Sequence, residues 1–247
     1  MQARRVAPAI LIAGFMIASV VTAQAGEPRA LLELFTSQGC SSCPPADRLV
    51  GQLTNDPSLI ALSIPIDYWD YLGWRDTLAN PAHSARQRAY ARTRGDGQVY
   101  TPQMVVNGAA DALGSDQAAI ERAIAQTDHK TGVMSLPVAL AVSNGTLNIS
   151  VSDADKAPAA AEVWLCPLTK AVPVAIGRGE NRGRTITYHN VVRNWLKLGT
   201  LTAAQSNWNV PIAQLRGEGI DAAAVMVQEG SHDKPGVILG AALTDIR

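Results

Sequence analysis

The sequence predicts an α/β domain, with a mixed sheet and flanking helices, followed by a C-terminal antiparallel β-module. Up to about Lys130, short apolar runs typical of buried strands alternate with helical patterns, and after that residue the helical patterns mostly stop. Asn-Gly pairs at 107–108 and 144–145 stand between strand patterns, which is a strong hairpin signal. We therefore expect two units, a domain over residues 26–130 and a β-sandwich-like module over residues 131–247.

The first unit reads strand, helix, strand, helix, strand, strand, helix. A polar turn with glycine and cysteine follows the first strand, and the helix after it has two prolines in its first turn, where the missing N–H groups cost nothing. Ser115 is expected to cap the last helix. The expected strands are Ala30–Phe35, Leu59–Ile66, Gln103–Val106 and Ala109–Leu113, and the expected helices are Pro44–Leu53, Ala82–Arg94 and one ending near Gln126.

The second unit reads as strands separated by Gly, Asn, Asp and Pro clusters. Apolar residues alternate on both sides of the Asn144-Gly145 turn, as a half-buried hairpin requires. The expected strands are Pro137–Val142, Leu147–Val151, Ala161–Leu168, Ala171–Ile176, Thr185–Val192, Ala223–Val227 and Val237–Ala242.

The first 25 residues predict a secretory signal peptide. Arg4 and Arg5 give a positive start, an uncharged apolar run follows to about Val21, and Ala23-Gln24-Ala25 is an A-x-A cleavage pattern. The run is short for a membrane span of about 20 residues. We expect cleavage after Ala25 and a periplasmic or secreted protein without membrane association, in an oxidising compartment.

The composition of the chain argues against several classes of protein. The 21 basic residues balance 21 acidic ones, and loss of the signal peptide leaves a net charge of about −2, so nothing favours nucleic-acid binding. Three cysteines are too few for a framework of bridges, and Cys166 lies among apolar residues as a buried thiol does. We expect no organic cofactor and no metal site, because the four histidines His83, His129, His189 and His232 show no ligand spacing.

The sharpest chemical feature is Cys40-Ser41-Ser42-Cys43, between an expected strand and an expected helix. Two intervening residues bring the sulfurs close enough to bond, and the helix N-terminus stabilises a thiolate on the more exposed Cys40. Cys43, one turn deeper, would resolve a mixed disulfide by attacking Cys40. The alternatives are a structural disulfide and a metal clip, although the second C-x-x-C typical of zinc sites is absent.

Two other features of the first unit are candidates for the same chemistry. Thr101-Pro102 directly precedes a strand, where a cis bond would make a tight turn, although a trans bond is the commoner state. In redox folds with this order of elements the turn faces the cysteines, and the backbone of the residue before the proline, here Thr101, pairs with the substrate. Glu33, inside an apolar strand, either relays a proton to Cys43 or points to solvent or pairs with an arginine. Asp47 is expected to interact with the helix dipole.

Two segments are candidates for recognising a partner. Tyr68, Trp69, Tyr71 and Trp74 are four of the chain's twelve aromatic residues, and they either form an aromatic lip beside the cysteines or pin a long connection to the body. Gly177–Arg184 packs three arginines and three glycines between strand patterns. A hairpin loop with solvated charges is the simpler interpretation, and a grip on a carboxylate or phosphate is the alternative.

Four strings carry a resemblance to known proteins: LLELFTSQGCSSCPPAD (Leu31–Asp47), YWDYLGW (Tyr68–Trp74), YTPQMVVNG (Tyr100–Gly108) and GENRG (Gly179–Gly183). With them the chain resembles an uncharacterised bacterial family of secreted thioredoxin-like proteins, domain of unknown function 1223, in the thioredoxin superfamily. The resemblance implies a thioredoxin-like fold and thiol–disulfide chemistry, in which Cys40 attacks, Cys43 resolves and Pro102 is the cis-proline. Gly39 replaces the aromatic residue that usually precedes the first cysteine, and the acid that thioredoxin buries has no aligned counterpart.

We therefore expect an exported thiol–disulfide oxidoreductase that exchanges disulfides with the cysteines of other periplasmic proteins. One alternative is a periplasmic Cu(I)-binding protein or metallochaperone that holds the ion with both thiolates, since soft ligands suit that ion. Another alternative is a partner-binding module whose disulfide is structural. A histidine or methionine near the cysteines would favour copper, whereas an uncluttered pair beside a cis-proline would favour exchange.

Overall fold

The computed structural model describes residues 27–215 and 217–247, so the expected signal peptide lies outside the described residues. The strands are β1 (Ala30–Thr36), β2 (Leu59–Pro65), β3 (Gln103–Val106), β4 (Ala110–Leu113), β5 (Val138–Ser143), β6 (Thr146–Val151), β7 (Ala161–Ala175), β8 (Thr185–Val192), β9 (Leu196–Thr200), β10 (Asn207–Pro211), β11 (Ala222–Ser231) and β12 (Lys234–Asp245). The helices are α1 (Pro44–Leu53), α2 (Pro81–Arg94), α3 (Gln117–Thr127) and the single turn α4 (Ile212–Leu215), with 3₁₀ turns at Asp70–Leu72 and Ala154–Lys156.

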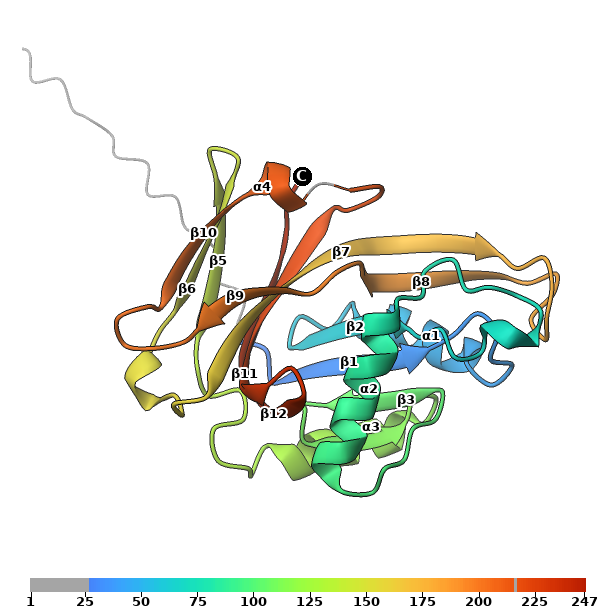
Figure 1. Cartoon of the computed structure of the whole chain (residues 1–247), viewed down its shortest axis with the longest axis horizontal. Coiled ribbons are helices and arrows are strands. Elements are labelled where there is room, and N and C mark those ends of the chain that lie inside the picture. Colours follow the sequence, from blue (N-terminus) through green and yellow to red (C-terminus); the bar gives the residue numbers. More distant parts are fainter. Residues whose placement is uncertain (1–26, 216) are drawn as a thin grey trace, which may run out of the picture.

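A mixed sheet with the strand order β12-β11-β7-β8-β2-β1-β3-β4 forms the body of the protein, and β9 pairs with β7 beside it (Figure 1). β1 runs parallel to β2 and antiparallel to β3, and every residue of β1 and β2 is buried. Leu31 and Phe35 face the side covered by α2, whereas Leu32 and Leu34 face α1 and α3. A strand buried on both faces explains the continuous apolar run in the sequence.

The mixed sheet continues past the expected domain boundary at residue 130. β8 lies parallel to β2, with Ser63 opposite Val191, and β7, β11 and β12 follow beyond β8. One apolar core therefore contains Phe35 of β1, Trp164 of β7 and Met226 of β11. The expected fold class is confirmed as a mixed sheet with helices plus a separate antiparallel sheet, but five of the C-terminal strands (β7, β8, β9, β11 and β12) belong to the mixed sheet rather than to an independent module.

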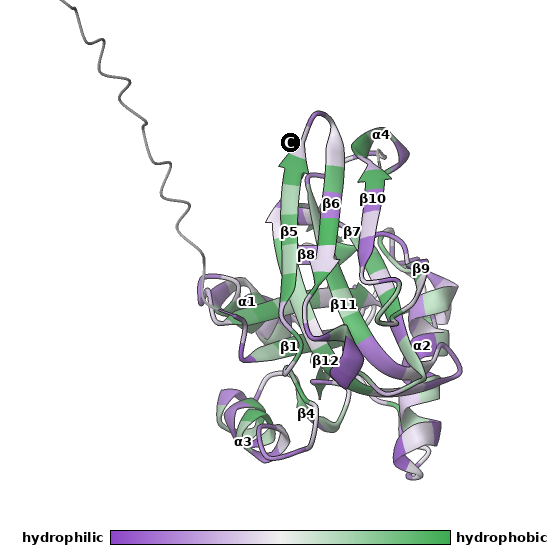
Figure 2. Ribbon diagram, turned by 90° about the vertical axis from the view of Figure 1, so that its left-hand side faces the viewer, coloured by the Kyte–Doolittle hydropathy of each residue, from purple (hydrophilic) through white to green (hydrophobic). Residues whose placement is uncertain are grey.

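The separate sheet consists of β10, β6 and β5 in that order. Leu147 and Ile149 of β6 pack against Leu165 of β7 and Val225 of β11, on one face of the C-terminal end of the mixed sheet (Figure 2). This part of the molecule has the two stacked layers of a β-sandwich. Both predicted Asn-Gly turns are present, with all four residues at positive φ.

Three local expectations need correction. β7 is one long strand instead of two, because it pairs with β11 over Ala161–Leu168 and with β8 over Leu168–Ala175. α3 is capped by Asp116 rather than Ser115, since the Asp116 carboxylate accepts from the Ala119 N–H at 2.9 Å. β9 and β10 were not expected at all. Over the residues that the structure describes, no helix has the length and apolarity to cross a bilayer.

Candidate functional site

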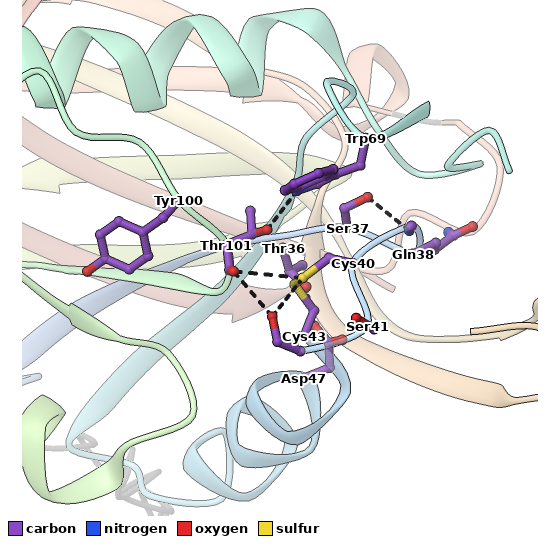
Figure 3. Close-up of a disulfide and its surroundings, with 12 residues drawn as sticks. Thr36, Ser37, Gln38, Cys40, Ser41, Cys43, Asp47, Trp69, Tyr100 and Thr101 are labelled. Atoms are coloured by element: carbon purple, nitrogen blue, oxygen red, sulfur yellow. Dashed lines mark hydrogen bonds between the residues drawn. A yellow bond between two sulfur atoms is a disulfide. The ribbon is translucent and has the colours of Figure 1, made fainter. Parts of the chain in front are cut away.

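Cys40 and Cys43 form a disulfide in the connection from β1 to α1 (Figure 3). The Cys43 N–H donates to the Cys40 carbonyl at 3.2 Å, and α1 starts at Pro44, with Cys43 as its N-cap. The helix begins after the cysteines rather than at them, because Pro44 and Pro45 have no N–H to continue it backward. Cys40 is 5% exposed and Cys43 fully buried, so only Cys40 is open to a partner.

The Thr101–Pro102 turn lies directly against Cys40, and its peptide bond is cis. The Thr101 carbonyl oxygen is 3.8 Å from Cys40 Sγ and accepts a hydrogen bond from Ser42 Oγ at 3.4 Å. Ser42 Oγ also lies 3.3 Å from Cys40 Sγ. The disulfide sulfur carries no proton, so the single proton of the Ser42 hydroxyl lies between two acceptors, the Thr101 carbonyl and Cys40 Sγ. After reduction the same proton can turn to a thiolate on Cys40.

Trp69 lies on the other side of the Cys40 loop. Its indole N–H donates to Thr101 Oγ1 at 2.8 Å, and a Cβ atom on Gly39 would come within 3.2 Å of Trp69 (Figure 3). Glycine at position 39 thus allows Trp69 to approach closely. Position 39 has no aromatic side chain, but Trp69 of the β2–α2 connection places an aromatic ring next to the cysteine loop.

The other three predicted aromatic residues have different surroundings. The Trp74 indole donates to Gln38 Oε1 at 2.8 Å, which ties it to the cysteine loop. The Tyr68 ring is half-buried 5.8 Å from the Trp69 ring. Tyr71 is 75% exposed and stacks on Trp69 with ring centroids 6.2 Å apart. Trp69 and Trp74 therefore hold the loop, and Tyr71 is the member with a free surface.

Glu33 lies on the opposite face of the sheet from the cysteines. Its Oε1 accepts from Arg86 Nε at 2.7 Å and its Oε2 accepts from the Tyr90 hydroxyl at 2.5 Å, in a fully buried ion pair. Alternation along β1 turns Glu33 toward α2, while α1 covers the other face. The expected proton relay from Glu33 to Cys43 is therefore wrong, and the alternative, pairing with an arginine, is observed.

The acid beside the cysteines is Asp47, one turn after Cys43 on α1 (Figure 3). It is 1% exposed, its Oδ1 accepts from Thr36 Oγ1 at 2.7 Å, and its Oδ2 has no hydrogen-bond partner within the described part of the chain. Burial raises the pKa of Asp47 to about 8, and the Thr36 hydrogen bond only partly opposes this. From the sequence, Asp47 was expected only to interact with the helix dipole, although its i, i+4 spacing from Cys43 places the two residues on one face of the helix.

The β7–β8 loop, Gly177–Arg184, packs against the cysteine loop, at the end of the long hairpin seen at the right of Figure 1. Asn181 is fully buried, and its Nδ2 donates to the Gln38 and Cys40 carbonyls, both at 2.9 Å. Glu180 Oε2 accepts from the Ser41 N–H at 3.3 Å. The loop is therefore part of the site, which the solvated-hairpin interpretation of its sequence did not anticipate.

The segment before α2 holds the cysteine loop from a third side. Asp76 Oδ2 accepts from the Gln38 N–H at 2.8 Å, and burial raises the pKa of Asp76 to about 6. Cys166 is fully buried far from this loop, beside Arg86 and Glu33, and burial raises the pKa of its thiol. Across residues 27–215 and 217–247, no three His, Cys, Asp or Glu side chains form a metal-binding group.

The fold and the site define a mixed α/β protein with a disulfide at the start of a helix, facing a cis-proline turn. The sequence model of DUF1223, a protein family of unknown function, matches residues 31–228, and the chain belongs to this family. No curated protein matches it.

Two solved structures are similar to the chain. A crystal structure of a protein from Agrobacterium tumefaciens has a TM-score of 0.76 and 27% identity, with 88% of this chain and 94% of that chain covered. HBP35 of Porphyromonas gingivalis has a TM-score of 0.60 and 14% identity, with 88% of this chain and 75% of that chain covered, and this second likeness concerns the fold alone.

Proposed function

We propose that this protein is an exported, thioredoxin-like thiol–disulfide oxidoreductase that acts on the cysteines of other proteins in the periplasm. The observation that carries the proposal is the position of Cys40, which is bonded to Cys43 just before α1 and lies 3.8 Å from the Thr101 carbonyl. A substrate chain that lies along Thr101 would bring its own sulfur to Cys40. Cu(I) binding by the same thiolates and a purely structural disulfide are the alternatives that the experiment below separates.

The exchange starts from the reduced pair. The Cys40 thiolate attacks a disulfide of the partner, forms a mixed disulfide and expels the partner's other sulfur as a thiolate. Cys43 then loses its proton and attacks Cys40 Sγ, which releases the partner's second sulfur and forms the Cys40–Cys43 disulfide of this structure. The partner gains two electrons and the pair loses two. The reverse sequence oxidises a partner dithiol.

Asp47 in its ionised form accepts the proton of Cys43 in the second step. Because the pKa of Asp47 is about 8, this form is the minority at pH 7, and the step should become faster as the pH rises toward 8. A free thiol has a pKa of about 8.5, and the pKa of about 8 for Asp47 makes proton transfer between the two groups nearly balanced. Both residues are buried, so a base from solvent does not reach Cys43 easily. Oδ2 of Asp47, which has no hydrogen-bond partner among the residues described, is free to take the proton.

Recognition of the partner combines main-chain and aromatic contacts. The backbone at Thr101 docks an extended segment next to Cys40, and the exposed Tyr71 ring offers it an apolar surface. Trp69 joins these two points, because it stacks on Tyr71 and donates to Thr101.

Trapping with Cys43→Ser tests the function. The variant cannot resolve the mixed disulfide, so a periplasmic extract should yield partners linked to Cys40 that a reductant releases. The matched control, Cys40→Ser/Cys43→Ser, should yield none. Failure to trap partners, combined with binding of one Cu(I) by the reduced wild type, would instead establish the copper alternative. A Cys40–Cys43 bond that resists dithiothreitol in the folded protein would establish a structural disulfide.

A further inference from the structure

The β7–β8 loop brings a carboxylate and a buried amide to the attacking cysteine from the distant C-terminal half of the chain. We propose that Glu180 and Asn181 are positioning residues that set the redox equilibrium of the Cys40–Cys43 pair. Asn181 fixes the shape of the cysteine loop, and Glu180 disfavours the Cys40 thiolate, which makes the pair more reducing. This inference rests on the proposed function and deepens it.

Asn181 is fully buried, and both ends of its amide are engaged. Nδ2 donates to the carbonyls of Gln38 and Cys40, the residues that flank Gly39, and Oδ1 accepts from Arg184 at 3.1 Å. These bonds fix the backbone that precedes the cysteine pair. The same bonds hold the neighbouring residue, Glu180, where its carboxylate accepts from the backbone N–H of Ser41.

Few backbone amides are available to a thiolate at this helix start. Pro44 and Pro45 lack the N–H, and the Cys43 N–H donates to the Cys40 carbonyl. The Ser41 N–H donates to Glu180 Oε2 at 3.3 Å. Glu180 therefore occupies one of the amides that could stabilise a thiolate at this helix start, and it adds a negative charge at the residue that follows Cys40.

The charges around Cys40 come from three elements. On the β7–β8 loop, Arg178 and Arg182 are exposed and Arg184 is bonded to Asn181. α1 contributes the exposed Arg48 and the buried Asp47. The segment before α2 contributes the half-buried Asp70, the exposed Arg75 and the buried Asp76. Among these groups Glu180 is the one bonded to the backbone of the residue next to Cys40.

The direction in which Glu180 shifts the redox potential follows from its effect on the stability of the Cys40 thiolate. A group that destabilises the thiolate destabilises the reduced pair, so the equilibrium shifts toward the disulfide and the potential becomes more negative. Replacing the Glu180 carboxylate by a neutral amide of the same shape should therefore favour the reduced pair.

The test is equilibration of the full-length protein with glutathione buffers, in which two glutathione thiols reduce the disulfide to two protein thiols and give one glutathione disulfide. Glu180→Gln should shift this equilibrium about threefold toward the dithiol, which corresponds to a potential about 15 mV less negative. The pH midpoint for alkylation of Cys40 should fall by about half a unit. Glu229→Gln, which removes an exposed carboxylate of β11, should change neither quantity. An unchanged equilibrium in Glu180→Gln, or a shift toward the disulfide, would overturn the proposal.

Asn181→Ala tests the positioning step. Without the amide the loop no longer holds Glu180 at Ser41, so adding Glu180→Gln to Asn181→Ala should shift the equilibrium by less than about 1.5-fold. A full threefold shift in that background would show that Asn181 does not position Glu180. Because glutathione needs no docking surface, a threefold effect of Glu180→Gln together with an empty Cys43→Ser trap would reject the proposed function and keep the tuning role.

Discussion

Two buried acids lie on opposite faces of the mixed sheet, and their surroundings differ. Both oxygens of Glu33 are hydrogen-bonded, one to Arg86 and one to Tyr90. Asp47 has one oxygen bonded to Thr36 and the other without a partner in the described residues. The Glu33 carboxylate thus has both oxygens engaged in hydrogen bonds, whereas the Asp47 carboxylate keeps one oxygen that can still take a proton.

The Glu33 side ties the two halves of the chain together. Arg86 Nη1 donates to Gln228 Oε1 at 3.0 Å, and Gln228 Nε2 donates to the Tyr90 hydroxyl at 2.8 Å. The Arg86 guanidinium also lies 4.3 Å from the centre of the Trp195 ring. These contacts join α2 to β1 and β11, so this buried acid is part of the scaffold, whereas Asp47 is the acid that the proposed exchange uses.

Breaking the ion pair between Glu33 and Arg86 should have the largest effect, a loss of folding stability. Arg86→Met leaves the Glu33 carboxylate buried without its cation and should lower the free energy of unfolding by about 3–5 kcal/mol, measured by urea denaturation. Glu33→Gln/Arg86→Met should lose less than the single variant, because no unpaired charge is buried in it. A double variant less stable than Arg86→Met would contradict the assignment of Glu33 as a paired charge.

Substitution of Asp47, the second buried acid, should slow a step of the exchange reaction rather than mainly lower the stability of the fold. Asp47→Asn cannot accept the proton of Cys43, so resolution of a mixed disulfide on Cys40 should slow by about 10²-fold above pH 8. At pH 7 the slowing should be about 10-fold, because most Asp47 carboxyls are protonated there in the wild type. Stopped-flow release of a chromogenic thiol from the Cys40 mixed disulfide measures this step. Asp233→Asn, an exposed acid in the β11–β12 turn, should resolve at the wild-type rate. Equal rates in all three proteins would remove Asp47 from the mechanism.

The smallest expected effect is on the pH dependence of the free energy of unfolding, compared between Asp47→Asn and the wild type. The pKa of Asp47 is raised from 3.8 to about 8, so between these values the folded state binds more protons than the unfolded state. The free energy of unfolding therefore falls as the pH rises from about 4 to about 8, and Asp76 adds to this fall up to about pH 6. Urea titrations should show a shallower fall for Asp47→Asn than for the wild type. An identical slope would mean that Asp47 is ionised at neutral pH.

Much of the fold was predictable because most strands and helices carry strong local signals. The apolar runs of β1 and β2 and the Asn107-Gly108 hairpin are local features, and they were predicted to within a residue or so. β9 and β10 have only five residues each, with sequences LKLGT and NWNVP, and their pairing with β7 and β6 makes them strands. The place of β8 beside β2 depends on long-range packing and left no local pattern.

The candidate site was predictable where its residues are close in sequence. The Cys40-x-x-Cys43 pair and the Thr101-Pro102 turn could be found by spacing. The roles of Glu33 and Asp47 could not, because β1 is apolar on both faces and alternation alone does not say which face carries α1. Asn181 lies in a loop whose composition is typical of solvent-exposed hairpins, and nothing local shows that its side chain is buried.

Asn181 and Cys40, which are in contact, lie 141 positions apart in the chain, so the two sides of the site are synthesised at different times. Chains are made from the N-terminus, so the cysteine pair emerges long before the loop that restrains it. An unfinished chain lacks the contacts of Asn181 and Glu180 with this loop. Under the tuning role proposed for Glu180, its cysteine pair should be more oxidising than that of the finished protein. The reactivity of Cys40 would then depend on whether the β7–β8 loop has been synthesised and has folded against the cysteine loop.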